Sequence, residues 1–113
     1  MRKTVIVIIA VAVVVGLFAQ RASAGYIVTG AKIIKIANTA NNQDYFSVLI
    51  SGGTGPCATM WVAFPQSAAA TQKILDRAFA LAMSAMTAGY VVSIYNYQSD
   101  SCDKAAYIEV SPN

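Results

Sequence analysis

The sequence contains no histidine, only two cysteines and few charged residues, 12% of the chain. Zinc, haem and iron–sulfur sites are built mostly from histidine and cysteine ligands, so the chain cannot assemble the usual ligand sets for these groups. The missing histidine also removes the base of Ser-His-Asp and Cys-His nucleophile systems. We therefore expect no metal, no other cofactor and no enzymatic activity, which leaves a role in binding or assembly.

An uncharged, mostly apolar run at residues 5–19 follows a short basic segment and precedes small residues at 22–24. This order is typical of a secretory signal peptide, here residues 1–24, with cleavage after Ala24. The alternative is an uncleaved membrane anchor. A helix that spans a bilayer needs about 20 apolar residues, however, and this run is shorter. The sequence therefore predicts a secreted or periplasmic protein without stable membrane insertion.

The remaining residues, 25–113, form one predicted domain. They carry five basic and five acidic residues, so the domain has a net charge of zero although the full chain has a net charge of +3. A nucleic-acid-binding domain usually carries a clustered basic surface, and we expect no nucleic-acid partner here. A domain of this size often needs a covalent link or an oligomeric partner to be stable.

The two cysteines can supply a covalent link. Export places Cys57 and Cys102 in an oxidising compartment, where an even number of cysteines normally pairs. The bridge would join positions 45 residues apart, and the chain-entropy model gives a loop of this size roughly 4 kcal/mol of stabilisation before strain. The alternative is a pair of buried free thiols. The sequence favours the disulfide.

The local pattern predicts mostly strands with one long helix. The expected strands are 26–36, 45–50, 59–64, 90–97 and 105–110. The expected helix is 68–88, with Ser67 as its N-cap and Gly89 as its left-handed stop. The glycines at 51–56 predict a flexible turn, because no Gly-Lys-Ser/Thr follows them as a phosphate-binding loop requires.

The predicted helix has more apolar surface than one sheet usually covers. One stripe begins at Leu75 and can pack on the sheet. A second stripe consists of Ile74, Ala78, Leu81 and Ala85. We expect this second stripe to face another copy of the chain. The alternative is a sheet that curls around the helix and buries both stripes within one chain.

Three segments carry a resemblance to a known family. They are Thr29-Gly30 with the aliphatic run to Ile36, then Tyr45-Phe46, and then the stretch Thr-Ala-Gly-Tyr-Val-Val-Ser-Ile-Tyr at 87–95. Together with the order of the elements, they resemble the binding (B) subunits of AB5-type bacterial toxins, in the subtilase cytotoxin and pertussis-like branch. The resemblance implies a mainly β fold with one long helix (α+β), an OB-fold-like five-stranded barrel packed with a single helix. It further implies a homo-oligomer, a ring of five, with a secreted catalytic subunit as a further partner.

The resemblance also implies a glycan site at Thr29, Tyr95 and Asn96, and therefore a cell-surface glycan as the ligand. The sequence departs from the family at Gly25, where the family has an acidic residue nearby, and in the placement of its cysteines. We expect a secreted, non-catalytic, oligomeric glycan-binding protein. The alternative is an exported structural or inhibitory protein of the envelope that has the same fold and no sugar site.

Overall fold

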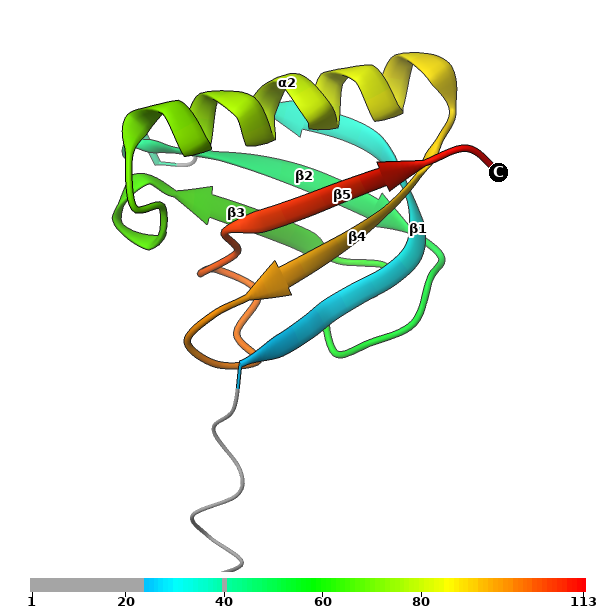
Figure 1. Cartoon of the computed structure of the whole chain (residues 1–113), viewed down its shortest axis with the longest axis horizontal. Coiled ribbons are helices and arrows are strands. Elements are labelled where there is room, and N and C mark those ends of the chain that lie inside the picture. Colours follow the sequence, from blue (N-terminus) through cyan, green and yellow to red (C-terminus); the bar gives the residue numbers. More distant parts are fainter. Residues whose placement is uncertain (1–23, 40) are drawn as a thin grey trace, which may run out of the picture.

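The computed structural model describes residues 24–39 and 41–113, which form five antiparallel strands and one long helix (Figure 1). In chain order the elements are β1 (Gly25–Ala37), β2 (Tyr45–Ser51), β3 (Trp61–Pro65), the short 3-10 helix η1 (Gln66–Ala68), α2 (Gln72–Ala88), β4 (Val91–Asn96) and β5 (Tyr107–Ser111). The strands make one sheet in the order β3-β2-β1-β4-β5. The predicted mainly β fold with one helix is confirmed. The predicted signal peptide, except Ala24, lies outside the described residues.

The central strand β1 is long and joins the two halves of the sheet. Its first half pairs with β4 and its second half pairs with β2. The register shifts at two places in the pairing with β4, and Gly30 adopts a positive φ of 64° within the second shift. Such irregularities bend a strand and increase its twist. The sheet therefore curves strongly beneath the helix (Figure 1).

The curvature does not close the sheet into the predicted barrel. The amide of Ala63 in β3 donates to the Cys102 carbonyl at 2.9 Å, and the Ala105 amide donates to the Ala63 carbonyl at 3.1 Å. These bonds reach only the segment that precedes β5, and β3 and β5 remain the two ends of the strand order. The expectation of a closed barrel was wrong because both end strands are only five residues long, and β5 begins beyond the residues that contact Ala63.

The glycine-containing loop after β2 is packed against β1 rather than flexible. The backbones of Thr54 and Thr29 exchange two hydrogen bonds of 2.9 and 3.0 Å, and the Cys57 amide donates to the Ile27 carbonyl at 2.9 Å. Gly55 has a φ of +116°, and a β-carbon there would lie 2.5 Å from the Ile27 carbonyl oxygen. The prediction of a flexible turn was therefore wrong, because this loop takes the place of a strand beside the first half of β1.

The helix α2 begins later than predicted. The side chain of Thr71 accepts a hydrogen bond from the Ile74 amide at 3.2 Å and is the N-cap, in place of Ser67. Ala69 is extended, with φ −92° and ψ 135°. The chain uses this extended link to pass from the end of β3 to the helix. Thr71 is then the residue at the start of the helix, and its hydroxyl can cap the first turn. The predicted stop is confirmed, since Gly89 is left-handed with φ 72°.

The helix packs on the concave side of the sheet, against β1, β4 and β5. Its buried residues are Leu75, Ala78, Ala82 and Ala85. Two members of the stripe predicted to face another copy, Ala78 and Ala85, are thus covered by the chain's own sheet. The other two differ: Ile74 is half-buried and Leu81 is 42% exposed. The curvature of the sheet explains the difference, because a curved surface covers a wider arc of the helix than a flat one.

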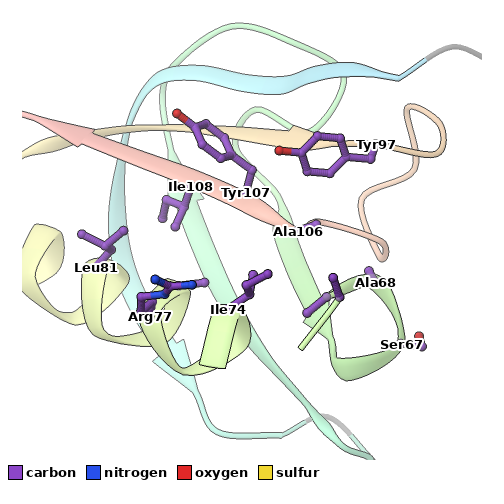
Figure 2. A pocket seen from close by; sticks show the side chains of 12 residues that line it. Ser67, Ala68, Ile74, Arg77, Leu81, Tyr97, Ala106, Tyr107 and Ile108 are labelled. Atoms are coloured by element: carbon purple, nitrogen blue, oxygen red, sulfur yellow. The ribbon is translucent and has the colours of Figure 1, made fainter. Parts of the chain in front are cut away.

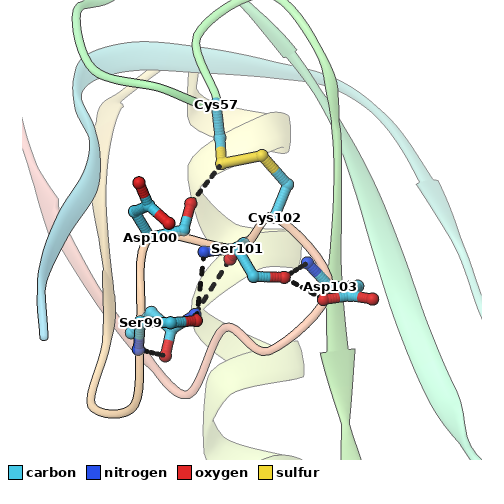
Figure 3. The surroundings of a disulfide bond; sticks show 7 residues. Cys57, Ser99, Asp100, Ser101, Cys102 and Asp103 are labelled. Carbon is cyan, nitrogen blue, oxygen red and sulfur yellow. Dashed lines mark hydrogen bonds between the residues drawn. A yellow bond between two sulfur atoms is a disulfide. The ribbon is translucent and has the colours of Figure 1, made fainter. Parts of the chain in front are cut away.

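The predicted disulfide is confirmed. Cys57 and Cys102 are bonded, with their α-carbons 5.7 Å apart (Figure 3). The bridge ties the loop between β2 and β3 to the loop between β4 and β5. The described residues contain no helix long and apolar enough to cross a membrane. Within the same part of the chain, no group of three or more His, Cys, Asp or Glu residues could hold a metal ion.

Candidate functional site

Four tyrosines gather on the outer face of the sheet, and we call this cluster (Tyr26, Tyr95, Tyr97 and Tyr107) the tyrosine platform. Tyr95 is its centre. The centroid of the Tyr95 ring lies 5.2 Å from that of Tyr26, 4.9 Å from that of Tyr97 and 6.4 Å from that of Tyr107. All three pairs meet edge to face, an arrangement that aromatic rings favour.

Strand pairing brings these rings together. Tyr95 is the ladder partner of Tyr26 on β1 and of Tyr107 on β5, so three adjacent strands present a tyrosine at the same level. Side chains alternate between the two faces of a strand. In β4 the even-numbered residues are buried and the odd-numbered ones are half-buried, which places Tyr95 on the outer face.

The platform is open to solvent. Tyr97 is 63% exposed, Tyr26 is 47% exposed and Tyr107 is 38% exposed. Proteins seldom leave contiguous aromatic surface of this kind in water unless it contacts something else. Because the rings brace one another, they offer a pre-arranged surface that loses little conformational entropy when a ligand binds.

A carboxylate lies beside the rings. The hydroxyl of Tyr107 donates to Glu109 Oε2 at 2.9 Å. This hydrogen bond, followed by burial and by the negative charge of Glu109, raises the pKa of Tyr107 above its ordinary value of 10.0. Burial among the neighbouring rings, followed by Glu109, raises the pKa of Tyr26 in the same direction. Both phenols are therefore protonated, and able to donate, well into the alkaline range.

Hydroxyl groups extend the same face. Thr29 and Thr54 share a hydrogen bond of 2.6 Å between their hydroxyl oxygens, and the Gly30 amide donates to Ser93 Oγ at 3.3 Å. Thr29 follows the buried Val28, and its half-buried side chain bonds to the loop beside β1. The structure thus places two predicted site residues, Thr29 and Tyr95, on the neighbouring strands β1 and β4.

The third predicted site residue, Asn96, is fully buried and does not belong to this face. Its Oδ1 accepts from the Gln98 and Ser99 amides at 2.8 and 3.1 Å, and its Nδ2 donates to the Ser101 carbonyl at 2.9 Å. The side chain organises the loop that leads to Cys102 and has no surface to offer a ligand. Its place follows from strand alternation, since a residue next to an outward tyrosine points inward.

Three of the platform tyrosines and Glu109 were not predicted as site residues. The alternation of Tyr95 and Tyr97 in the sequence is a visible signal for one of them. Tyr26 and Tyr107 lie 69 and 12 residues from Tyr95, and only the strand order shows that they meet.

A groove lies next to the platform, between α2 and the edge strand β5, and we call it the helix–strand groove (Figure 2). Its volume is about 740 Å³, and it is lined by Ser67, Ala68, Ala69, Ala70, Ile74, Arg77, Ala78, Leu81, Tyr97, Ala106, Tyr107 and Ile108. Two of these residues, Tyr97 and Tyr107, belong to the platform as well. The platform and the groove are therefore continuous.

These features define a small, disulfide-linked α+β protein with an exposed aromatic surface on its sheet. A family model matches residues 7–112, and the chain belongs to that family, described as a family of unknown function (DUF5992). No curated protein matches the chain significantly, and neither does any solved structure.

Proposed function

We propose that this chain is an exported, non-catalytic binding protein that holds carbohydrate on the tyrosine platform. The observation that carries the proposal is the set of four contacting tyrosine rings on one face of the sheet, three of which are exposed. Binding sites place a few directed polar groups beside apolar or aromatic surface. The platform has this composition, with Glu109 and the phenol hydroxyls around the rings.

Carbohydrate suits this surface better than nucleic acid does. The C–H face of a sugar ring packs on a tyrosine ring, and its hydroxyls pair with phenols and with a carboxylate. Nucleic acid also stacks on aromatic rings, but it needs cations for its phosphates. The charged group that bonds to the rings is the Glu109 carboxylate, which accepts hydrogen bonds from sugar hydroxyls and offers no cation to the row of phosphates in a nucleic acid.

The disulfide supports export, because such bonds persist in oxidising compartments such as the periplasm and the cell exterior. Export is compatible with what the resemblance to AB5 toxin binding subunits implies, namely a ligand on a cell surface and a secreted catalytic subunit as a further partner. A protein with a single small site per chain gains strength when several copies bind together.

Self-association is the second part of the proposal, through a different face of α2 from the one predicted. The exposed side of the helix carries Ala80, Met83, Ser84 and Thr87, and no residue from Ala78 to Ala88 is charged. We assign this face to contact with other copies of the chain. A ring of five is the arrangement that the resemblance implies.

Screening the full mature protein on a glycan array tests the carbohydrate proposal. We expect selective binding that falls by about ten-fold in Tyr97→Ser, because one stacking surface is lost. Thr29→Ala should cost less, since its hydroxyl is already bonded to Thr54. Tyr90→Ser is the matched control: Tyr90 is 42% exposed and lies outside the platform.

An array without signal for the wild-type protein would contradict carbohydrate binding and favour the structural or inhibitory alternative. Equal losses in Tyr97→Ser and Tyr90→Ser would show that the platform is not the site.

Light scattering of the wild-type protein and of Met83→Asp tests the assembly. We expect an oligomer that dissociates in the variant, because a carboxylate would be buried between copies. A monomeric wild-type protein at tens of micromolar would contradict this part of the proposal.

A further inference from the structure

The helix–strand groove has apolar walls on both sides. Ile74 and Leu81 project from α2, and Ile108 lies opposite them on β5 (Figure 2). Alanines line most of the remaining surface, and they leave the groove wide because their side chains are short. A groove with such walls favours a hydrocarbon chain, which gains free energy by leaving water and asks for no hydrogen bonds.

The groove has one charged lining residue, Arg77, and no acidic one. Arg77 stands between Ile74 and Leu81 on the helix. The neighbouring carboxylate of Asp76 accepts a hydrogen bond from Gln72 Nε2 at 2.9 Å and is not part of the groove. The groove therefore combines an apolar wall with a single positive charge, which complements an amphiphile that carries one acidic group.

The order of residues along the groove sets the direction of such a ligand. Tyr97 and Ala106 lie at the end near Ala68, whereas Leu81 and Ile108 lie toward the other end (Figure 2). Arg77 lies between the two ends. A ligand that begins on Tyr97 therefore passes Ile74, meets the Arg77 guanidinium next and reaches the apolar walls around Leu81 last (Figure 2).

We propose that the natural ligand is an anionic glycolipid whose sugar lies on the tyrosine platform and whose single acyl chain lies in the helix–strand groove. Its acidic group, at the junction of sugar and chain, pairs with Arg77. This inference rests on the proposed function, since it uses the platform as the sugar site. It adds a second contact surface and a charge requirement that a free oligosaccharide does not satisfy.

The groove accommodates a chain of moderate length. Its helical wall runs from Ile74 to Leu81, and the part beyond Arg77 is four residues long, which at 1.5 Å per residue is about 6 Å and matches about five carbons. Each fully buried methylene is worth about four-fold in affinity, so even a half-buried chain of this length adds more than ten-fold.

Isothermal titration with octyl phosphate and ethyl phosphate, both below micellar concentration, tests the groove without any sugar. We expect octyl phosphate to bind at least about ten-fold more tightly than ethyl phosphate. Leu81→Asp should abolish this difference, because it places a charge in the apolar wall. Met83→Asp is the matched control, since Met83 is 41% exposed, close to the 42% of Leu81, and does not line the groove.

The charge requirement has its own pair of variants. Arg77→Gln should lower the affinity for octyl phosphate by about ten-fold and leave the affinity for neutral octyl glucoside unchanged. Lys73→Gln removes a charge from the same exposed side of the helix, outside the groove, and should change neither. Equal effects of the two substitutions would show a general charge effect and would overturn the role of Arg77.

The last comparison links the groove to the platform. A glycan selected on the array should bind at least about ten-fold more tightly when it carries a phosphate-linked octyl chain. Equal affinity with and without the chain would overturn this inference and leave carbohydrate binding intact. Octyl phosphate binding together with a silent array would instead contradict the proposed function. If the affinity of the oligomer for alkyl phosphates does not depend on chain length, the inference is overturned. This outcome includes the case in which another copy of the chain fills the groove.

Discussion

Two neighbouring residues of β4, Tyr95 and Asn96, differ completely in what they can contact. Tyr95 lies at the centre of the tyrosine platform, whereas Asn96 is fully buried and bonded within the loop that follows. The resemblance to toxin binding subunits placed both in one site. Their separation is a property of the strand, because adjacent side chains point to opposite faces.

We expect Asn96→Ala to destabilise the protein by about 1–3 kcal/mol, because the substitution leaves buried amide and carbonyl groups without partners. Urea unfolding of the oxidised protein measures this change. Gln98→Ala alters an exposed residue of the same loop and should change the unfolding free energy by less than about 0.5 kcal/mol. Similar values for the two variants would mean that the Asn96 hydrogen bonds do not hold the loop.

Glu109 determines how the platform responds to alkaline pH. The carboxylate raises the pKa of Tyr107 and contributes to the raised pKa of Tyr26, so we expect Glu109→Gln to move both toward 10.0. A raised pKa in the folded state means that the protonated phenols stabilise the folded protein. This contribution is complete below pH 10.0 and is lost as the pH rises through the raised pKa values. Phenolate absorbance measures the titration, and Asp76→Asn, on the helix, is the charge control. An unchanged titration in Glu109→Gln would contradict the assignment.

At the scale of elements, two segments depart from their local preference for the same reason. Residues 68–70 are alanines, yet α2 begins only after Thr71, because the chain must first cross from β3 to the helix. The glycines after β2 suggest flexibility, yet their loop lies against β1 with regular backbone hydrogen bonds. In both places a tertiary contact outweighs a preference of less than about 1 kcal/mol per residue.

Gly55 provides a test of the packed loop. Gly55→Ala adds a β-carbon 2.5 Å from the Ile27 carbonyl oxygen, at a φ of +116° that other residues rarely adopt. We expect a loss of about 2–4 kcal/mol of unfolding free energy. Gly25→Ala is the control, because nothing lies within 4 Å of its added β-carbon. A loss in Gly55→Ala no larger than in Gly25→Ala would show that the loop is free to move.

At the scale of the whole molecule, the disulfide joins the two loops that lie beside the two halves of the curved sheet. We expect denatured, unreduced protein to show no free thiol, and reduction to cost roughly 2–4 kcal/mol of stability. Thiol titration and thermal unfolding with and without reductant measure the two effects. Two reactive thiols in protein isolated from the periplasm would contradict the bridge.

The proposed assembly and the proposed ligand site also belong to this scale, and they are assigned to different sides of α2. Met83 faces the proposed contact between copies, and Leu81 lines the helix–strand groove. Met83→Asp should therefore change the oligomer and spare amphiphile binding, and Leu81→Asp should do the reverse. Opposite effects of the two substitutions are expected only if assembly and amphiphile binding use separate surfaces.

The sequence by itself determined the features that depend on short stretches of chain: five strands, one helix, the stop at Gly89, and a disulfide that follows from the count of cysteines and the predicted export. Only the tertiary structure decided that Tyr26 and Tyr107 join Tyr95, that Ala78 and Ala85 are covered by the sheet, and that the sheet stays open. The physical reason is that side-chain periodicity is local, whereas strand order, register and curvature depend on contacts between distant segments.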